Sequence, residues 1–245
     1  EKVSFSPFGD IEKLRETVND QTAFVILEPI QGESGIHVAP DGFLQDVRKI
    51  CDEKGVLLIF DEIQAGLGRT GKMWAHEHFV INKKLIKPDI ISFGKKAQVC
   101  GMLAGDRILE VDKNVFQESS RINSTFGGNL IDMVRFKIIL ETIEKYSLLK
   151  NAEDLGKYLL DKIKFLESNF PGFVSNSRGC GLFSAFDLPS STERDRVIQE
   201  SYKNKLLILS SGDCSVRFRP HLTVTKEEIN IAIDILYKSI KEVLN

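Results

Sequence analysis

The chain of 245 residues is 42% hydrophobic and 28% charged, which is the composition of an ordinary globular protein with one or two domains. Its 33 Lys and Arg residues against 35 Asp and Glu residues give a net charge of −2, so we expect no nucleic acid and no anionic membrane surface as a partner. No apolar run approaches the roughly 20 residues of a membrane-spanning helix, and the first residues lack the apolar core of a signal peptide.

The first elements predict a strand–helix–strand unit. A short polar helix over 10–19 precedes an apolar strand at 22–27, which leads into a polar loop. An amphipathic helix over 41–54 follows, and then an apolar strand at 56–61. Continuous apolar runs are typical of strands buried on both faces, so we expect two buried, parallel strands. The predicted inward face of the second helix consists of Phe43, Leu44, Val47, Ile50 and Cys51.

The next segment contains glycine turns and polar strand ends. A glycine-rich turn spans 66–71, and Pro88-Asp89 introduces a buried strand at 90–93 that ends at Gly94-Lys95-Lys96. A short return strand is predicted at 102–104 and a polar, glycine-bearing loop at 123–129. An apolar stripe predicts a long helix over 130–146.

After residues 147–151 the organisation changes to helices alternating with short strands, which favours a smaller α+β domain. We expect residues 1–147 to be the C-terminal part of a large cofactor-binding domain and residues 148–245 to be a small C-terminal domain. The predicted elements of the second part are helices at 152–168, 192–204 and 225–243, and strands at 173–178, 182–187, 206–209 and 215–219.

One interpretation of the glycine turn is a P-loop, because Gly66 to Lys72 nearly spells a Walker A sequence beside an acidic strand end. The match fails at Met73, where a Ser or Thr hydroxyl has to reach the magnesium ion. The order is also wrong, since the glycines follow the acidic strand instead of opening an earlier strand–helix unit.

A second interpretation is a dinucleotide site, because Gly66, Gly68 and Gly71 also fit G-x-G-x-x-G. In that case Asp61 and Glu62 would lie close to a pyrophosphate, and no helix start follows the turn. A mobile glycine turn explains the pattern better.

Metal chemistry is not expected either. His76 and His78 form an H-x-H pair around Glu77, with no cysteine ligand nearby in the sequence, and we assign them structural roles. The four cysteines are widely spaced and form no C-x-x-C pair. Reduced thiols in the cytoplasm are therefore expected, without a disulfide framework or a metal site.

A third interpretation uses polar residues from distant parts of the chain. Glu33, Asp61 with Gln64, Lys95 and Thr125 all follow strand ends or lie in glycine loops. A pyridoxal phosphate enzyme needs a lysine that reacts with the cofactor aldehyde and a carboxylate that keeps the pyridine nitrogen protonated. Partial burial of Lys95 after an apolar strand would favour the neutral, nucleophilic amine.

These motifs resemble those of one family over essentially the whole chain. The segments 28–33 (EPIQGE), 58–71 (LIFDEIQAGLGRTG), 88–90 (PDI) and 93–95 (FGK) look like the signature of class III pyridoxal-phosphate aminotransferases. The resemblance implies a fold type I pyridoxal-phosphate transferase, an α/β fold with a large, mostly parallel sheet domain and a small α+β domain. Within the class, segments 94–101, 123–129, 216–220 and 222–225 are most similar to the branch that acts on L-lysine.

The resemblance also implies roles for single residues. Lys95 is the Schiff-base lysine and proton shuttle, Asp61 pairs with the pyridinium nitrogen, and Gln64 approaches the phenolic oxygen of the cofactor. Thr125 reaches the phosphate of the partner subunit's cofactor, which implies a homodimer with shared active sites.

Two further residues are implied to bind the substrate. Arg217 clamps the substrate α-carboxylate, a task that suits the planar guanidinium group. Glu33 acts as a gate that pairs with a cation in one half-reaction and releases it in the other.

The implied activity transfers the terminal amino group of L-lysine to 2-oxoglutarate and gives 2-aminoadipate 6-semialdehyde and glutamate. Members of the family are longer, and their large domain begins before the point that matches Glu1, so we expect this chain to be the C-terminal part of the enzyme. The alternatives are another class III activity, with ornithine or 4-aminobutyrate as the donor, or a non-catalytic truncated remnant of the fold.

Overall fold

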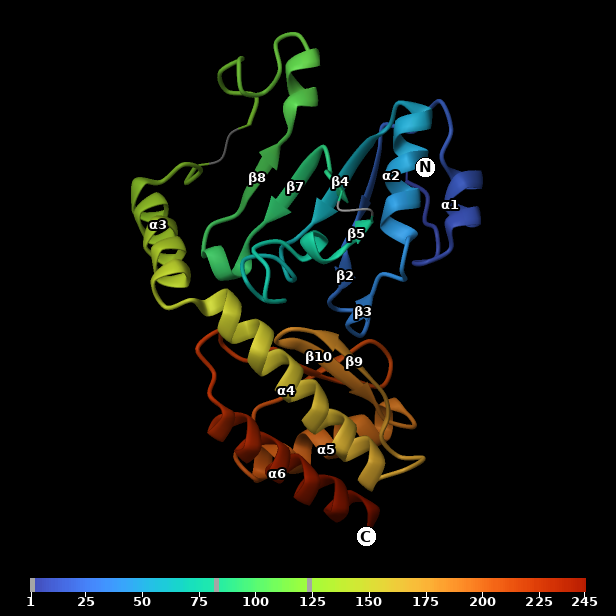
Figure 1. Ribbon diagram of the computed structural model, residues 1–245, viewed down its shortest axis with the longest axis vertical. Helices are drawn as coiled ribbons and strands as arrows, with labels where there is room; N and C mark the ends of the chain where they lie inside the picture. Colours follow the sequence, from blue (N-terminus) through green and yellow to red (C-terminus); the bar gives the residue numbers. More distant parts are fainter. Residues whose placement is uncertain (1–2, 82–83, 123–124) are drawn as a thin grey trace. The chain divides into compact units, whose positions relative to one another are not determined.

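The computed structural model describes residues 3–81, 84–122 and 125–245 (Figure 1). Asn123 and Ser124 of the predicted polar loop lie outside the described residues. The chain divides into two compact units that interleave along the sequence, and each is described by itself. The first unit contains residues 1–29, 39–67 and 76–142, and the second contains residues 30–38, 68–75 and 143–245.

The first unit is built on a four-stranded sheet in the order β1-β4-β7-β8. Three of these strands, β1 (Phe24–Leu27), β4 (Leu57–Asp61) and β7 (Ile90–Phe93), run parallel to one another. The fourth strand, β8 (Gly101–Ala104), pairs antiparallel with β7. The predicted parallel pair and the predicted return strand are therefore confirmed.

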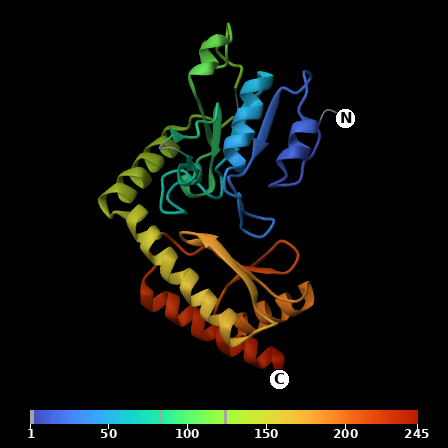
Figure 2. The same ribbon diagram turned by 45° about the vertical axis from the view of Figure 1, so that its right-hand side comes forward.

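Two helices accompany this sheet. The first, α1 (Ile11–Thr17), begins at Asp10, whose carboxylate accepts a hydrogen bond from the backbone N–H of Lys13 at 2.9 Å. The second, α2 (Phe43–Lys54), joins β1 to β4 and buries the whole of its predicted inward face. Both helices lie next to each other in the two views (Figures 1 and 2).

The prediction that these strands are buried on both faces is wrong for this chain. In β1, Phe24 and Ile26 are 51% and 53% exposed, because they lie on the face of the sheet that they share with Leu57 and Ile59, and this face is poorly covered in the described part of the chain. In β4, Leu58 and Phe60 are fully buried, whereas Leu57 and Ile59 on the opposite face are only partly buried. The apolar run therefore indicated the strand but not the covering of both its faces.

Asp89, which directly precedes β7, is the centre of a cluster of charged residues. Its carboxylate accepts a hydrogen bond from the backbone N–H of Leu58 at 2.7 Å and forms ion pairs with Arg48 at 2.9 Å and Arg107 at 3.2 Å. Burial opposes ionisation of Asp89, but the Leu58 hydrogen bond and the two arginines outweigh it and lower the pKa of this carboxyl. Asp89 thus ties the start of β7 to β4 and α2.

We expect Asp89→Asn to lower the free energy of unfolding by about 3 kcal/mol at neutral pH, because the variant removes the buried carboxylate charge that pairs with the partly buried Arg48 and Arg107. The pKa of Asp89 is lower in the folded state, so its stabilising contribution is present above the unfolded pKa of about 4 and is lost as the pH falls further. Thermal melts of parent and variant at pH 7 and below pH 4 measure this. The difference between the two proteins should shrink in acid, and a constant difference would contradict the assignment.

The remaining elements of this part of the chain are short, except for one helix. They are the 3₁₀ turns Ala75–His78, Lys95–Ala97 and Asp106–Glu110, the paired strands β5 (Val80–Ile81) and β6 (Lys84–Leu85), and α3 (Leu130–Lys145). The long helix predicted over 130–146 is confirmed as α3. Most of its apolar stripe is exposed, and only Ile143 is buried.

The second unit is an antiparallel sheet in the order β11-β12-β10-β9. Its strands are β9 (Ser175–Cys180), β10 (Phe183–Asp187), β11 (Leu209–Ser211) and β12 (Ser215–Phe218). Its helices are α4 (Leu148–Asn169), α5 (Ser191–Lys203) and α6 (Lys226–Leu244). The predicted elements after residue 150 all occur, and β11 begins three residues later than the predicted strand.

The three helices enclose a continuous apolar core with this sheet. Leu159, Ile163 and Leu166 of α4 and Leu236 and Ile240 of α6 are all almost fully buried in one cluster with β10 and β12. Thr225 and Glu228 form a capping box that fixes the start of α6. Within the described residues, no helix is long and apolar enough to cross a membrane.

Sequence reasoning missed a small hairpin in the second unit. β2 (Ile30–Gln31) pairs antiparallel with β3 (His37–Val38), and the loop between them carries Glu33. Strands of two residues leave no periodicity to detect. The loop predicted over 30–35 therefore contains part of a short structured element.

Candidate functional site in two units

The first group of predicted site residues lies at the carboxyl ends of β4 and β7. Asp61 is the last residue of β4 and pairs in register with Ser92 of β7. The backbone N–H of Glu62 continues the ladder with a hydrogen bond to the Ser92 carbonyl at 3.0 Å. Lys95 follows Ser92 by three residues, so Asp61 and Lys95 leave neighbouring parallel strands at the same edge of the sheet. Ligands of open α/β sheets bind at this edge.

Lys95 has an unusual backbone. Its φ of 48° is in the left-handed region, which non-glycine residues rarely adopt, and it opens the 3₁₀ turn Lys95–Ala97. Gly94 before it is buried, and a side chain there would meet Cys100 Sγ at 3.3 Å. Lys95 itself is exposed, so the partial burial expected from the sequence is wrong for this chain. The exposed Lys95 therefore follows the end of β7 on a residue with a strained backbone.

Asp61 and Gln64 are held by backbone contacts. The Asp61 carboxylate accepts a hydrogen bond from the backbone N–H of Ile63 at 3.0 Å, and the side chain is partly buried. Gln64 is buried, and its backbone carbonyl oxygen accepts a hydrogen bond from Lys96 Nζ at 2.8 Å. Lys96 therefore fixes the turn that carries Gln64, which is consistent with a non-catalytic role beside Lys95.

Glu62 has a different environment from Asp61. Its carboxylate is fully buried and accepts hydrogen bonds from the backbone N–H and from Nδ1 of His76, both at 2.9 Å. Glu62 is fourteen residues before His76 in the sequence, and the fold brings the two side chains into contact. The structural role of His76 fits this contact. Among the described residues, no three His, Cys, Asp or Glu side chains form a group that could hold a metal ion.

The glycine turn after Gln64 is tightly packed. Residues 65–71 are all buried. In the second unit, a side chain at Gly68 would meet Leu149 at 3.0 Å, and one at Gly71 would meet the backbone of Glu153 at 3.0 Å. Both glycines thus allow close packing against α4. A turn buried in this way offers little surface to a phosphate, which argues against both nucleotide interpretations.

The second group of predicted site residues lies in the second unit. Arg217 Nη1 of β12 lies 2.9 Å from Glu33 Oε1 in the β2–β3 loop. The Arg217 side chain is 9% exposed and that of Glu33 is 64% exposed. Arg217 Nε is buried without a hydrogen-bond partner in the described part of the chain. The guanidinium therefore retains donor capacity for an anion while Glu33 holds one of its nitrogens.

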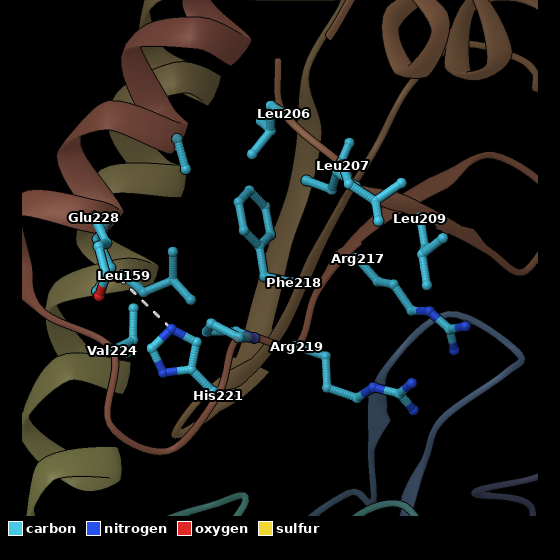
Figure 3. A pocket seen from close by; sticks show the side chains of 14 residues that line it. Leu159, Leu206, Leu207, Leu209, Arg217, Phe218, Arg219, His221, Val224 and Glu228 are labelled. Carbon is cyan, nitrogen blue, oxygen red and sulfur yellow. Dashed lines mark ion pairs between the residues drawn. The ribbon is translucent and has the colours of Figure 1, made fainter. Parts of the chain in front are cut away.

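Arg219 is a neighbour of Arg217 that the sequence argument did not select. Burial, the positive charge of Arg217 and the opposing charge of Glu33 act on Arg219, with a net lowering of its pKa. Figure 3 shows the guanidinium groups of Arg217 and Arg219 extending in the same direction, away from Leu206 and Phe218. A cavity of about 380 Å³ opens beside them. The paired guanidinium groups of Arg217 and Arg219 make this end of the cavity attractive to anions.

Thr125 is exposed in a turn before α3. Its predicted role toward a partner subunit's cofactor stays a prediction. Phe126 next to it is 77% exposed, and Leu130 and Ile131 at the start of α3 are 80% and 68% exposed. The surface around Thr125 is therefore apolar.

Comparison with known proteins identifies the family. The sequence model of the class III aminotransferases matches residues 6–240. The chain belongs to the class III aminotransferases. These enzymes depend on pyridoxal 5′-phosphate and have the fold type I architecture, so the fold class and the cofactor expected from the sequence are confirmed.

Individual relatives narrow the comparison. The L-lysine-epsilon aminotransferase of Mycobacterium tuberculosis is 47% identical over 219 residues, which are 89% of this chain and 47% of that protein. An acetylornithine aminotransferase of Methanocaldococcus jannaschii is 34% identical over 98% of this chain and 58% of its own length. The solved lysine aminotransferase from M. tuberculosis in the internal aldimine form superposes with a TM-score of 0.89 at 43% identity, over 95% of this chain and 53% of that one. The chain thus spans about half the length of the lysine aminotransferases it matches.

The residues present fit pyridoxal phosphate. An exposed lysine amine and a partly buried carboxylate leave neighbouring parallel strands, which lie about 4.8 Å apart in such sheets. The cofactor requires an amine that can reach its aldehyde and a carboxylate that can face its ring nitrogen. Lys95 and Asp61 are of the right chemical types at the right edge of the sheet.

Proposed function

We propose that this chain is the C-terminal part of an L-lysine 6-aminotransferase. The reaction moves the terminal amino group of L-lysine to 2-oxoglutarate and gives 2-aminoadipate 6-semialdehyde and glutamate. The observation that carries this proposal is the placement of Lys95 and Asp61 at the ends of two strands paired in register. The higher identity to the lysine enzymes than to the acetylornithine enzyme favours lysine as the donor.

Lys95 and Asp61 are proposed to have separate roles in the chemistry. The bound cofactor supplies an electron-accepting ring that stabilises negative charge on the substrate carbon. Lys95 Nζ removes the proton from the ε-carbon of lysine, and its exposure leaves the amine room to move during the reaction. The Asp61 carboxylate holds a proton on the ring nitrogen, while its hydrogen bond from Ile63 keeps the carboxylate oriented. Gln64 is proposed to approach the phenolic oxygen from the turn that Lys96 fixes.

Glu33 and Arg217 are proposed to handle the two different substrates. When the Glu33 carboxylate pairs with Arg217, the arginine charge is neutralised and does not attract the α-carboxylate of lysine. When Glu33 moves away, Arg217 takes the α-carboxylate of 2-oxoglutarate, for which its buried and unpartnered Nε supplies a further donor. The high exposure of the Glu33 side chain suits a group that has to leave and return.

We also propose a homodimer in which Thr125 contributes to the partner subunit's cofactor site. The support is the exposed apolar surface beside Thr125 and along α3, which includes Val134 and Ile138 at 58% and 55% exposure. Contiguous apolar surface of this kind is typical of a protein interface. A second chain is the occupant that the predicted role of Thr125 requires.

A cytoplasmic location is a further proposal. All four cysteines are free thiols in the structure, although Cys51 is buried and Cys100 is exposed. Both proposed substrates are small metabolites. Cell fractionation with an antibody against the protein tests the location.

Borohydride trapping tests the proposed function. We expect the full-length protein, incubated with pyridoxal phosphate and reduced, to carry one phosphopyridoxyl group on Lys95 in peptide mass spectra. A panel of lysine, ornithine and 4-aminobutyrate with 2-oxoglutarate then identifies the donor, with lysine expected to be fastest. An adduct elsewhere, or none, would contradict the chemistry, whereas an adduct on Lys95 with faster turnover of another donor would contradict only the substrate.

A further inference from the structure

The loop that carries Glu33 is fastened to the turn between β11 and β12. The backbone N–H of Gly212 donates a hydrogen bond to the Glu33 carbonyl at 2.8 Å. The buried hydroxyl of Ser211 lies 2.9 Å from the Gly32 carbonyl and 3.2 Å from the Glu33 carbonyl. Both contacts hold the backbone of Glu33 and leave its side chain exposed.

Arg178 fastens the other end of the same loop. Its Nε donates a hydrogen bond to the Gly35 carbonyl at 2.9 Å, and its Nη2 contacts Ser215 Oγ at 2.8 Å and Asp187 Oδ1 at 2.9 Å. Burial opposes ionisation of Asp187, but hydrogen bonds from Ser215 and Arg178 outweigh it and lower the pKa of this carboxyl. Arg178 is therefore a fixed cation in β9 that spans from β10 to the loop.

Close packing shows how little room this arrangement leaves. Gly212 has a φ of 52°, and a side chain there would lie 2.5 Å from the Ser34 carbonyl oxygen. A side chain at Gly35 would lie 3.0 Å from Arg178 Nη2 and 3.2 Å from Ser215 Oγ. The loop and the β11–β12 turn therefore touch through backbone atoms, with no layer of side chains between them.

The same turn leads directly into β12, which carries Arg217. The two sides of the Glu33–Arg217 ion pair are thus joined by backbone contacts only a few residues away from the pair. We propose that Gly212, Ser211 and Arg178 are positioning residues that keep Glu33 within reach of Arg217 and so determine how strongly the enzyme excludes α-amino donors. This inference rests on the proposed function.

The loop contacts should affect donor preference because they set the effective concentration of the Glu33 carboxylate at Arg217. A carboxylate held by a short, fastened loop competes with the α-carboxylate of a substrate for Arg217 more strongly than one on a loose loop. Loss of one or two loop hydrogen bonds should weaken the competing Glu33 contact by roughly 3- to 10-fold. Arg217 then accepts α-carboxylates more readily, so 2-oxoglutarate binds more tightly and glutamate becomes a better donor relative to lysine.

The chain offers matched variants for the test. Gly212→Ala forces the loop away from the turn, and Gly172→Ala is its control, because Gly172 has a φ of 79° in the same unit with no atom near the added side chain. Ser211→Ala is a milder variant that removes only the hydroxyl. Its control is Ser168→Ala, since the exposed Ser168 hydroxyl bonds only the Phe165 carbonyl of its own helix.

Two measurements on the full-length protein decide the inference. The first is hydrogen–deuterium exchange of the peptide covering residues 30–38 without added cofactor, which reads the fastening of the loop independently of activity. We expect faster exchange in Gly212→Ala and Ser211→Ala and no change in the two controls. Unchanged exchange in both loop variants would overturn the inference.

The second measurement is the ratio of kcat/KM for lysine to kcat/KM for glutamate, together with KM for 2-oxoglutarate in the pyridoxal phosphate-loaded protein. We expect the ratio and KM to fall roughly 3- to 10-fold in the loop variants and to stay within about 2-fold in the controls. Faster exchange with an unchanged ratio would overturn the positioning role, because a merely structural defect lowers both donors alike. An inactive parent protein would instead contradict the proposed function. That outcome is distinguished from failure of the inference because every protein in the series, controls included, would then be inactive.

Discussion

Replacing Lys95 with alanine should lower transamination by at least about 10³-fold, because proton transfer by a positioned amine contributes a factor of this order and the covalent link to the cofactor is lost as well. The amine is exposed at the end of β7, on a residue with strained backbone, and a strained backbone at an accessible nucleophile is typical of a functional position. Steady-state turnover of lysine and 2-oxoglutarate by the full-length variant measures the effect.

Lys96→Ala is the informative comparison for Lys95→Ala. The two lysines are adjacent, but Lys96 Nζ is engaged with the Gln64 carbonyl at 2.8 Å. We expect its loss to disturb the Gln64 turn and lower turnover by about 10-fold or less, in line with a lost hydrogen bond. Borohydride should still trap the cofactor on Lys95 in this variant. Equal losses in the two variants, or trapping on Lys96, would show that the wrong lysine has been assigned.

The sequence predicted the local elements better than their surroundings. The apolar runs of β4 and β7 and the stripe of α2 are strong periodic signals, and each element formed where expected. The exposure of Phe24 and Ile26 could not be predicted in this way, because a run of apolar residues does not reveal whether other elements cover both faces of its sheet. The same limit applies to α3, whose apolar side is exposed in this chain.

Candidate site residues followed a similar pattern. Asp61 and Lys95 could be selected because polar residues directly after buried parallel strands meet at one edge of a sheet. The partner of His76 could not be selected in this way, since Glu62 is fourteen residues away and becomes its neighbour only when the turn after β4 folds back. Arg178, Ser211 and Gly212 were missed for the same reason. Their importance comes from contacts with residues 32–35, about 140 to 180 positions earlier.

Substitution of Asp61 should lower turnover, whereas substitution of the adjacent Glu62 should lower stability. Asp61→Asn should lower kcat for the lysine half-reaction by about 10² to 10³-fold, which is the usual cost of removing one preorganised charged group from an active site. The amide cannot hold the proton on the ring nitrogen, so the electron-accepting character of the cofactor weakens. Folding should change little, because Asp61 is partly exposed and accepts one backbone hydrogen bond.

Glu62→Gln should instead act on stability. The Glu62 carboxylate is fully buried and bonds both the backbone N–H and Nδ1 of His76, so an amide leaves part of this contact unsatisfied at a cost of about 1–3 kcal/mol. Rapid-mixing measurement of cofactor absorbance with lysine and thermal melts on the same two variants separate the effects. If Glu62→Gln slows the half-reaction as much as Asp61→Asn at full occupancy of the folded state, then the chemical role belongs to the pair and not to Asp61. The structure predicts the opposite, because Asp61 ends β4 beside the strand that Lys95 follows, whereas the Glu62 carboxylate is engaged with His76.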